Sequence, residues 1–103
     1  MNIRLFTRQI ERTQTLVDHA QRRAIFAFDR FGDMVRDIEI RVDDINGPRG
    51  GAGIACLARV RLVSGGDVLV ESRAVSPEDG ITLTLSRLAN RLRRLTSRHQ
   101  DHG

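Results

Sequence analysis

The most regular hydrophobic pattern in the chain lies between Ser76 and His99. Its apolar residues recur every three or four positions, at Ile81, Leu85, Leu88, Leu92 and Leu95. This spacing places one apolar stripe along an α-helix. Ser76 as N-cap, then Pro77 and the acidic pair Glu78 and Asp79, is typical of a helix start. The segment is therefore predicted to be a long helix with one buried face, weakened by about 1 kcal/mol if Gly80 is fully helical.

A second helical pattern runs from about Gln14 to Phe31. Thr13 is a suitable N-cap, and Gly32 suits the position just after a helix end. Its predicted core face comprises Val17, Ala20, Ala24, Phe28 and Phe31. Phe26 projects nearly opposite this face. It is either a single exposed aromatic residue or a contact residue that stacks on a base or packs on a partner.

Four segments alternate apolar and polar residues with the period of a β-strand. They are residues 2–7, 36–43, 54–64 and 67–75. Gly65 and Gly66 predict a tight hairpin turn between the last two strands. The Gly- and Pro-rich residues 44–53 predict a hairpin tip, at which Arg49 is a candidate RNA-backbone contact. Residues 100–103 are expected to fray.

The order of these elements predicts an α+β fold, a single β-α-β-β-β-α domain over residues 1–103. The helix between the first two strands is a crossover connection, which should be right-handed and make these strands parallel. The two hairpins should make the second, third and fourth strands antiparallel to one another in turn. Each helix has one apolar stripe, so both should pack on one face of a four-stranded mixed sheet. This arrangement is expected to set the basic flanks of the two helices side by side.

Charge narrows the class of partner. The net charge is +4, the sequence pI is about 11.1, and all 17 basic residues are arginine. These values favour a polyanionic partner, and arginine suits bidentate phosphate contacts, although a coding bias toward arginine would give the same composition. The lack of lysine excludes a P-loop lysine and a Schiff base.

Arginines of the last helix form a second stripe, centred roughly 90° from the leucines. No Asp or Glu occurs between Gly80 and Gln100, so these arginines have no acidic partner within their own helix. The stripe is either a solvated face or a phosphate-binding ridge, and the missing acids favour the ridge. With the basic sector of the first helix, the candidate RNA-binding residues are Arg22, Arg23, Arg30, Arg87, Arg91, Arg94 and Arg98.

The sequence offers little support for catalysis. The histidines, His19, His99 and His102, lack metal-ligand spacing, and no nucleophile elbow is present. Cys56 is the only cysteine and faces inward in its strand, so we expect a buried, unreactive thiol. We expect no enzyme activity, metal, cofactor or small-molecule substrate. The sequence has neither a signal peptide nor a bilayer span, so we expect a cytoplasmic protein without a membrane partner.

The opening residues Met1–Leu5, the Arg8–Thr13 entry to the first helix and the Leu88–Leu95 stretch together resemble one family over nearly the whole chain. It is the ribosome hibernation-promoting factors, also called ribosome-associated inhibitor or sigma-54 modulation proteins, in their short form. The better-known members carry lysines where this chain has only arginines, and its 46–51 loop also differs. Because the sequence stops after its predicted second helix, we expect no counterpart of the long form's C-terminal dimerisation domain.

This resemblance implies a non-catalytic factor that binds rRNA of the small ribosomal subunit in the mRNA and tRNA channel. It would silence translation, as hibernation, under stress or in stationary phase. By position, the seven candidate arginines correspond to the family's rRNA-contacting surface.

Two alternatives remain open. One is a general double-stranded RNA-binding domain, because an α-β-β-β-α order is embedded in the chain. The other is a protein-interaction module that uses the outer sheet face at Phe6, Leu57 and Leu69. The absence of Tyr and Trp argues against a reader that stacks successive bases of a single strand.

Overall fold

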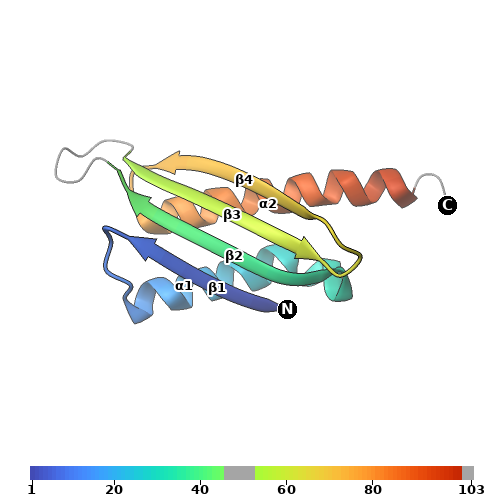
Figure 1. Cartoon of the computed structure of the whole chain (residues 1–103), viewed down its shortest axis with the longest axis horizontal. Coiled ribbons are helices and arrows are strands. Elements are labelled where there is room, and N and C mark those ends of the chain that lie inside the picture. Colours follow the sequence, from blue (N-terminus) through green and yellow to red (C-terminus); the bar gives the residue numbers. More distant parts are fainter. Residues whose placement is uncertain (46–52, 101–103) are drawn as a thin grey trace.

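The computed structural model describes the backbone of residues 1–45 and 53–100, and the side chains within these ranges up to residue 96. Figure 1 shows the order of its elements. They are β1 (Asn2–Arg8), α1 (Gln14–Phe28), the 3-10 helix η1 (Asp29–Met34), β2 (Val35–Asp44), β3 (Ile54–Leu62), β4 (Asp67–Ala74) and α2 (Pro77–Gln100). Arg49 and most of the predicted hairpin tip lie outside the described residues, as do 101–103; Gln100 belongs to α2.

The four strands form one mixed sheet in the order β1-β2-β3-β4. β1 is parallel to β2, and β3 is antiparallel to both of its neighbours. The register places Leu5 opposite Ile40 and Ile40 opposite Ala58, so that apolar side chains of neighbouring strands share one face. The predicted α+β fold class and strand directions are confirmed.

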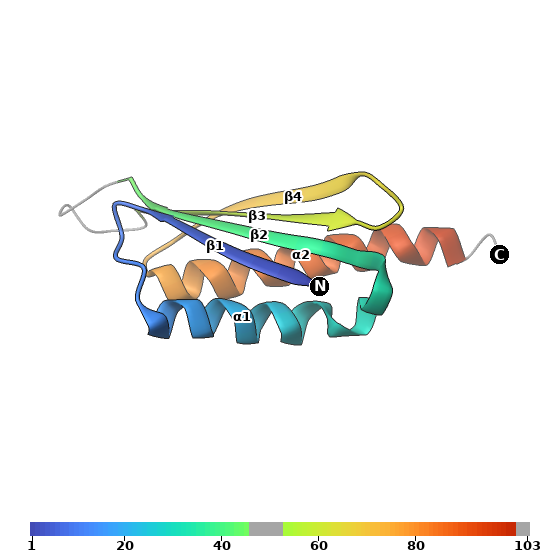
Figure 2. The same ribbon diagram turned by 60° about the horizontal axis from the view of Figure 1, so that its bottom comes forward.

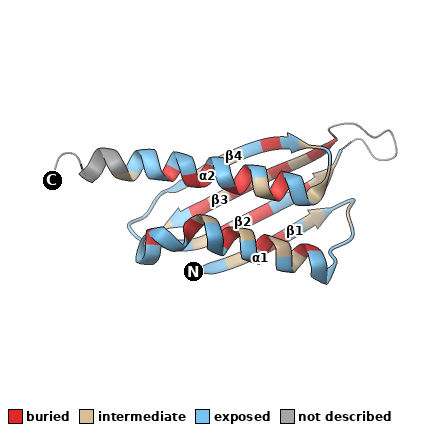
Figure 3. Cartoon of the chain, turned by 180° about the vertical axis from the view of Figure 1, so that it is seen from behind, coloured by how far each residue is buried: buried red, intermediate tan, exposed pale blue. Residues whose placement is uncertain are grey.

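Both helices cover the same face of the sheet (Figures 2 and 3). α1 packs on β1 and β2, whereas α2 packs on β3 and β4 and also against α1. The core between the layers contains Leu5, Leu16, Ala20, Ala24, Phe28, Phe31, Val35, Ile38, Ile40, Val42, Ile54, Cys56, Ala58, Val60, Ile81, Leu85, Leu88, Ala89 and Leu92. Among the described residues, nothing covers the opposite face of the sheet (Figure 2).

The first helix differs from its prediction at its end and on its core face. Its N-cap is Thr13 as expected, because the Leu16 N–H donates to Thr13 Oγ1 over 3.1 Å. The α-helix ends at Phe28, however, and not at Phe31. Phe31 belongs to the 3-10 helix η1 and is buried there; η1 contains Gly32, whose φ is 53°. Leu16 is fully buried and Val17 only partly, since the i+4 row from Leu16 to Phe28 is the one that points at the sheet.

The second helix begins as predicted but buries a shorter stripe. The Asp79 N–H donates to Ser76 Oγ over 3.2 Å. The first four members of the predicted stripe are buried, but Leu95 is 41% exposed, so its assignment to the core was wrong. Figure 2 gives the reason: the C-terminal turns of α2 project past the end of the sheet, where no strand covers them.

Gly80 lies where α2 comes closest to the sheet. A Cβ atom built there would stand 3.4 Å from the Cys56 Cβ, 3.6 Å from the Ala74 Cβ and 3.6 Å from the Ile54 Cγ2. These are ordinary van der Waals distances, so one methyl group fits and a longer side chain does not. The glycine that weakens the helix locally therefore permits the close approach of helix and sheet.

Substitutions at Gly80 should separate helix propensity from packing. Gly80→Ala should raise the free energy of unfolding by up to about 1 kcal/mol, because alanine is the better helix former. Gly80→Leu should lower it by about 1–3 kcal/mol through overpacking against the sheet. Urea unfolding measures both effects. A leucine variant as stable as the wild type would contradict the close contact.

Candidate nucleic-acid interface

The arginines of α2 lie mainly on the side of the helix that faces β4. Arg87 Nη1 donates to the hydroxyl of buried Ser72 on β4 over 3.3 Å, which fixes this flank next to the sheet edge. The exposed arginines around it line a hollow of about 450 Å³, together with Val70 and Asn90. We call these residues the arginine ridge: Arg87, Arg91, Arg93 and Arg94. The side chain of the seventh candidate, Arg98, lies outside the described residues.

A second hollow, which we call the interhelix groove, runs between α1 and α2. It has a volume of about 200 Å³. Its walls are formed by Arg23, Phe26, Ala27, Arg30, Thr82, Leu85, Ser86, Ala89 and Asn90. Arg22 is exposed on α1 and lines neither hollow. The six described candidate arginines thus fall into three on the ridge, two in the groove and one separate residue.

The two helices do not set their basic flanks side by side, as the sequence had suggested. The flank of α2 that faces α1 carries Thr82, Ser86 and Ala89, and Arg93 continues this row by helix periodicity. Arg87, Arg91 and Arg94 lie on the other flank, toward β4. Asn90, on the crest of α2, lines both hollows. The sequence spacing predicts the angle between the arginine stripe and the leucine stripe around the helix axis. It does not predict which element each flank of α2 contacts, because that depends on which strands the helix covers.

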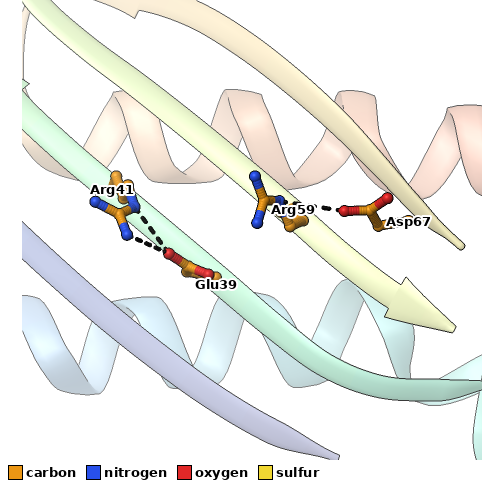
Figure 4. A network of polar contacts seen from close by, with 4 residues as sticks. All are labelled: Glu39, Arg41, Arg59 and Asp67. Carbon is orange, nitrogen blue, oxygen red and sulfur yellow. Dashed lines mark hydrogen bonds and ion pairs between the residues drawn. The ribbon is translucent and has the colours of Figure 1, made fainter. Parts of the chain in front are cut away.

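Ion pairs are confined to the strands among the described residues. Arg41 Nη2 lies 2.7 Å from Glu39 Oε1, and Arg59 Nε lies 3.4 Å from Asp67 Oδ2, as Figure 4 shows. Arg36 and Asp37 form a third, looser pair at 3.7 Å. By contrast, no described acid lies within 4.0 Å of the ridge arginines or of Arg22, Arg23 and Arg30. Among the described residues these arginines therefore have no ion-pair partner, and the phosphates of a polyanion would supply one.

The outer face of the sheet has a different character. Its charges alternate in register across the strands, as in Arg4 opposite Glu39 and Glu39 opposite Arg59. Phe6 is 42% and Leu69 39% exposed, as the protein-interaction alternative expected, but Leu57 is half-buried. The Arg41 guanidinium lies 5.0 Å from the Phe6 ring centroid and so covers part of that ring. The apolar side chains are thus separated by charged ones and form no continuous patch.

His19 has a structural position between the helices. Its Nε2 lies 3.0 Å from the Glu78 carbonyl oxygen and 2.9 Å from Thr82 Oγ1, so it links α1 to the first turn of α2. Within the described residues, no three His, Cys, Asp or Glu side chains are grouped to hold a metal ion. No described helix is long and apolar enough to cross a membrane.

This architecture is found among solved structures, and two of them illustrate it. The N-terminal domain of Protein Y from Thermus thermophilus superposes with a TM-score of 0.75 at 23% identity, covering 92% of this chain and 99% of that one. A ribosomal subunit interface protein from Coxiella burnetii gives 0.76 at 16% identity, covering 94% and 99%. The chain has the fold of the hibernation-promoting factors. No family profile and no curated protein matches the sequence. The likeness thus confirms the predicted resemblance for the fold.

Sequence reasoning missed several residues of these two hollows. Arg93 was not among the candidates because it lies off the main arginine stripe, yet it lines the same hollow as Arg91 and Arg94. Ser86 and Asn90 carry no charge and drew no attention. Their position opposite the apolar stripe, on the crest and inner flank of the helix, was the available signal.

Cys56 is buried at 2% exposure on the inner face of β3, as predicted. Burial raises the pKa of its thiol, and a hydrogen bond with Thr84 offsets part of that rise. The Thr84 hydroxyl itself donates to the Gly80 carbonyl over 2.6 Å, which satisfies a second buried polar group. A thiol that stays protonated is a poor nucleophile, which argues against covalent chemistry at this residue.

The raised thiol pKa predicts a loss of stability in alkali. In the unfolded chain the thiol ionises near pH 8.5, whereas the folded chain holds the proton to higher pH. Stability should therefore be unaffected below about pH 8.5 and fall above it by at most about 1.4 kcal/mol per pH unit. Urea unfolding from about pH 7 to pH 10 tests this, with Cys56→Ala as the control that lacks the effect. Equal slopes for the two proteins would refute it.

Proposed function

We propose that this protein is a non-catalytic, ribosome-associated factor that binds rRNA of the small subunit in the mRNA and tRNA channel and thereby silences translation. The observation that carries the proposal is the set of helix arginines that have no ion-pair partner among the described residues. It is supported by the shared fold of Protein Y and of a protein described as a ribosomal subunit interface protein. Because ribosomes work in the cytoplasm, the proposal implies a cytoplasmic protein. A factor that silences translation would act in stress or in stationary phase.

The physical basis of recognition would be electrostatic and shape-based. The guanidinium groups of the ridge project from one helix, and that helix is held against the sheet by a buried apolar stripe. Such groups bind phosphate oxygens bidentately, and each phosphate neutralised releases counterions. A rigid row of arginines therefore selects RNA whose phosphates have a matching spacing, with little dependence on base sequence.

Silencing would follow from occupancy alone. A folded domain bound in the channel excludes mRNA and tRNA from the same space, so no chemical step is required. The effect then depends on the protein's concentration relative to its dissociation constant. This agrees with a helix side that offers charged side chains and hydrogen-bonding groups rather than a catalytic constellation.

Charge reversal on the ridge should abolish binding to the small subunit. We expect Arg91→Glu with Arg94→Glu to weaken binding at least about 100-fold, because phosphate contacts become repulsions. Sedimentation with purified small and large subunits measures it. The matched control is Arg8→Glu with Arg61→Glu, which makes the same charge change at exposed arginines of β1 and β3 outside the ridge and groove. If both double variants lose binding equally, only net charge matters and the ridge has no special role.

Salt dependence and competitor RNA distinguish the remaining alternatives. Replacing a single ridge arginine by glutamine should weaken binding gradually and lower the slope of log K against log salt by about 1. Comparable affinity for any RNA duplex would favour a general double-stranded RNA-binding domain instead. Subunit binding that is insensitive to salt and to the ridge variants would exclude both RNA-binding functions.

A further inference from the structure

Phe26 is the most exposed large hydrophobic side chain among the described residues, at 77%. It stands on α1 at the rim of the interhelix groove. The Arg23 guanidinium carbon lies 5.0 Å from its ring centroid. An aromatic ring has two faces, so an arginine stacked on one leaves the other for a planar ligand. The side chain thus forms an oriented, partly open stacking platform.

The groove beside Phe26 supplies groups suited to the rest of a nucleotide. Arg23 and Arg30 are without an acidic partner among the described residues, and Arg30 is oriented by the Phe31 ring at 5.2 Å. Stacking occupies the faces of these guanidinium groups and leaves their N–H edges free for phosphate oxygens. On the opposite wall, the hydroxyl of Ser86 and the amide of Asn90 have no hydrogen-bond partner in the described part of the chain.

We infer that the interhelix groove holds one unpaired nucleotide of RNA. Its base stacks on the free face of Phe26, its phosphate lies between Arg23 and Arg30, and its base edge meets Ser86 and Asn90. An asparagine amide both donates and accepts, so it can pair with the edge of a base. The inference rests on the proposed function in one respect, because the rRNA would supply the nucleotide.

The size and charge of the groove favour this occupant. Its volume of about 200 Å³ is below the roughly 300–1,000 Å³ of pockets that enclose drug-sized ligands. It therefore suits a single planar group rather than a helix or a folded partner. The groove is lined by two arginines and by no described acid, which favours an anionic ligand. The exposed Phe26 ring favours a planar ligand, and a nucleotide is both anionic and planar at its base. RNA-binding proteins commonly stack unpaired bases on aromatic side chains in this way.

Substitution at Phe26 separates stacking from electrostatics. Phe26→Ala should weaken binding to purified small ribosomal subunits by roughly 5- to 150-fold while leaving the salt slope unchanged, because stacking releases no counterions. Phe26→Trp should preserve binding. Arg23→Gln should instead lower the slope by about 1. Ile25→Ala, an equally simple truncation of the neighbouring exposed side chain, is the control and should bind as the wild type does.

Two results would overturn the inference while the proposed function stands. One is a Phe26→Ala variant that binds subunits as tightly as the wild type. The other is a Phe26→Ala variant whose salt slope falls as that of Arg23→Gln does, since Phe26 would then serve only to orient Arg23. Thermal unfolding of each variant excludes loss of fold as the cause.

A second measurement does not depend on ribosomes. The chain contains no Trp or Tyr, so Phe26→Trp introduces a single indole whose fluorescence reports on this position alone. Titration with single-stranded hexaadenylate should quench it, and an RNA duplex of equal length should not. If the wild type fails to bind subunits, the proposed function fails, and this titration still decides the groove: absent quenching, or equal quenching by the duplex, would overturn the site.

Discussion

The burial of α2 against β3 and β4 determines where the functional charges of this protein lie. Its apolar stripe fixes the rotation of the helix, and Gly80 allows the helix to approach the sheet within van der Waals distance of three side chains. Once that rotation is fixed, the arginine flank must face the β4 edge and the polar flank must face α1. The hydrogen bond from Arg87 to Ser72 links the arginine ridge to the sheet, because a ridge arginine satisfies a buried hydroxyl of β4.

Charge is divided between the two faces of the molecule. On the strands, arginines face or contact acids, so this surface approaches local neutrality. On α2, the ridge arginines lie beyond the acids of the first turn and have no ion-pair partner among the described residues, so their mutual repulsion costs stability at low salt. A fold gains nothing from such crowding by itself. The same repulsion becomes favourable when phosphates enter between the arginines, so the arrangement is consistent with a surface adapted to a polyanion rather than to solvent alone.

The sequence predicted the helices, the strands and their order better than it predicted which surfaces of these elements contact one another. Alternation in β2 and β3, the Thr13 and Ser76 caps and the right-handed crossover rule were sufficient to predict the topology. Periodicity failed where the tertiary surroundings change along a helix. Leu95 continues the pattern of Leu92 but is 41% exposed, and the C-terminal turns of α2 project past the sheet. Periodicity also could not tell which flank of α2 would meet α1. The two flanks lie at similar angles on either side of the buried stripe, so either could face α1. Only the strands that α2 covers decide between them.

Strong electrostatic attraction and exact placement make different demands on a binding surface. Arginines on a rigid helix attract any polyanion, and a phosphate backbone can slide along them because its charges repeat. One stacking contact in a groove beside them would remove that freedom, since an unpaired base occurs only at particular places in folded RNA. A single phenylalanine is enough for this purpose, whereas a reader of extended single strands needs several aromatic residues in succession. On the helix side, Phe26 is the one exposed ring among the described residues, next to arginines but outside their ridge. This arrangement therefore fits recognition of structured RNA better than recognition of a flexible strand.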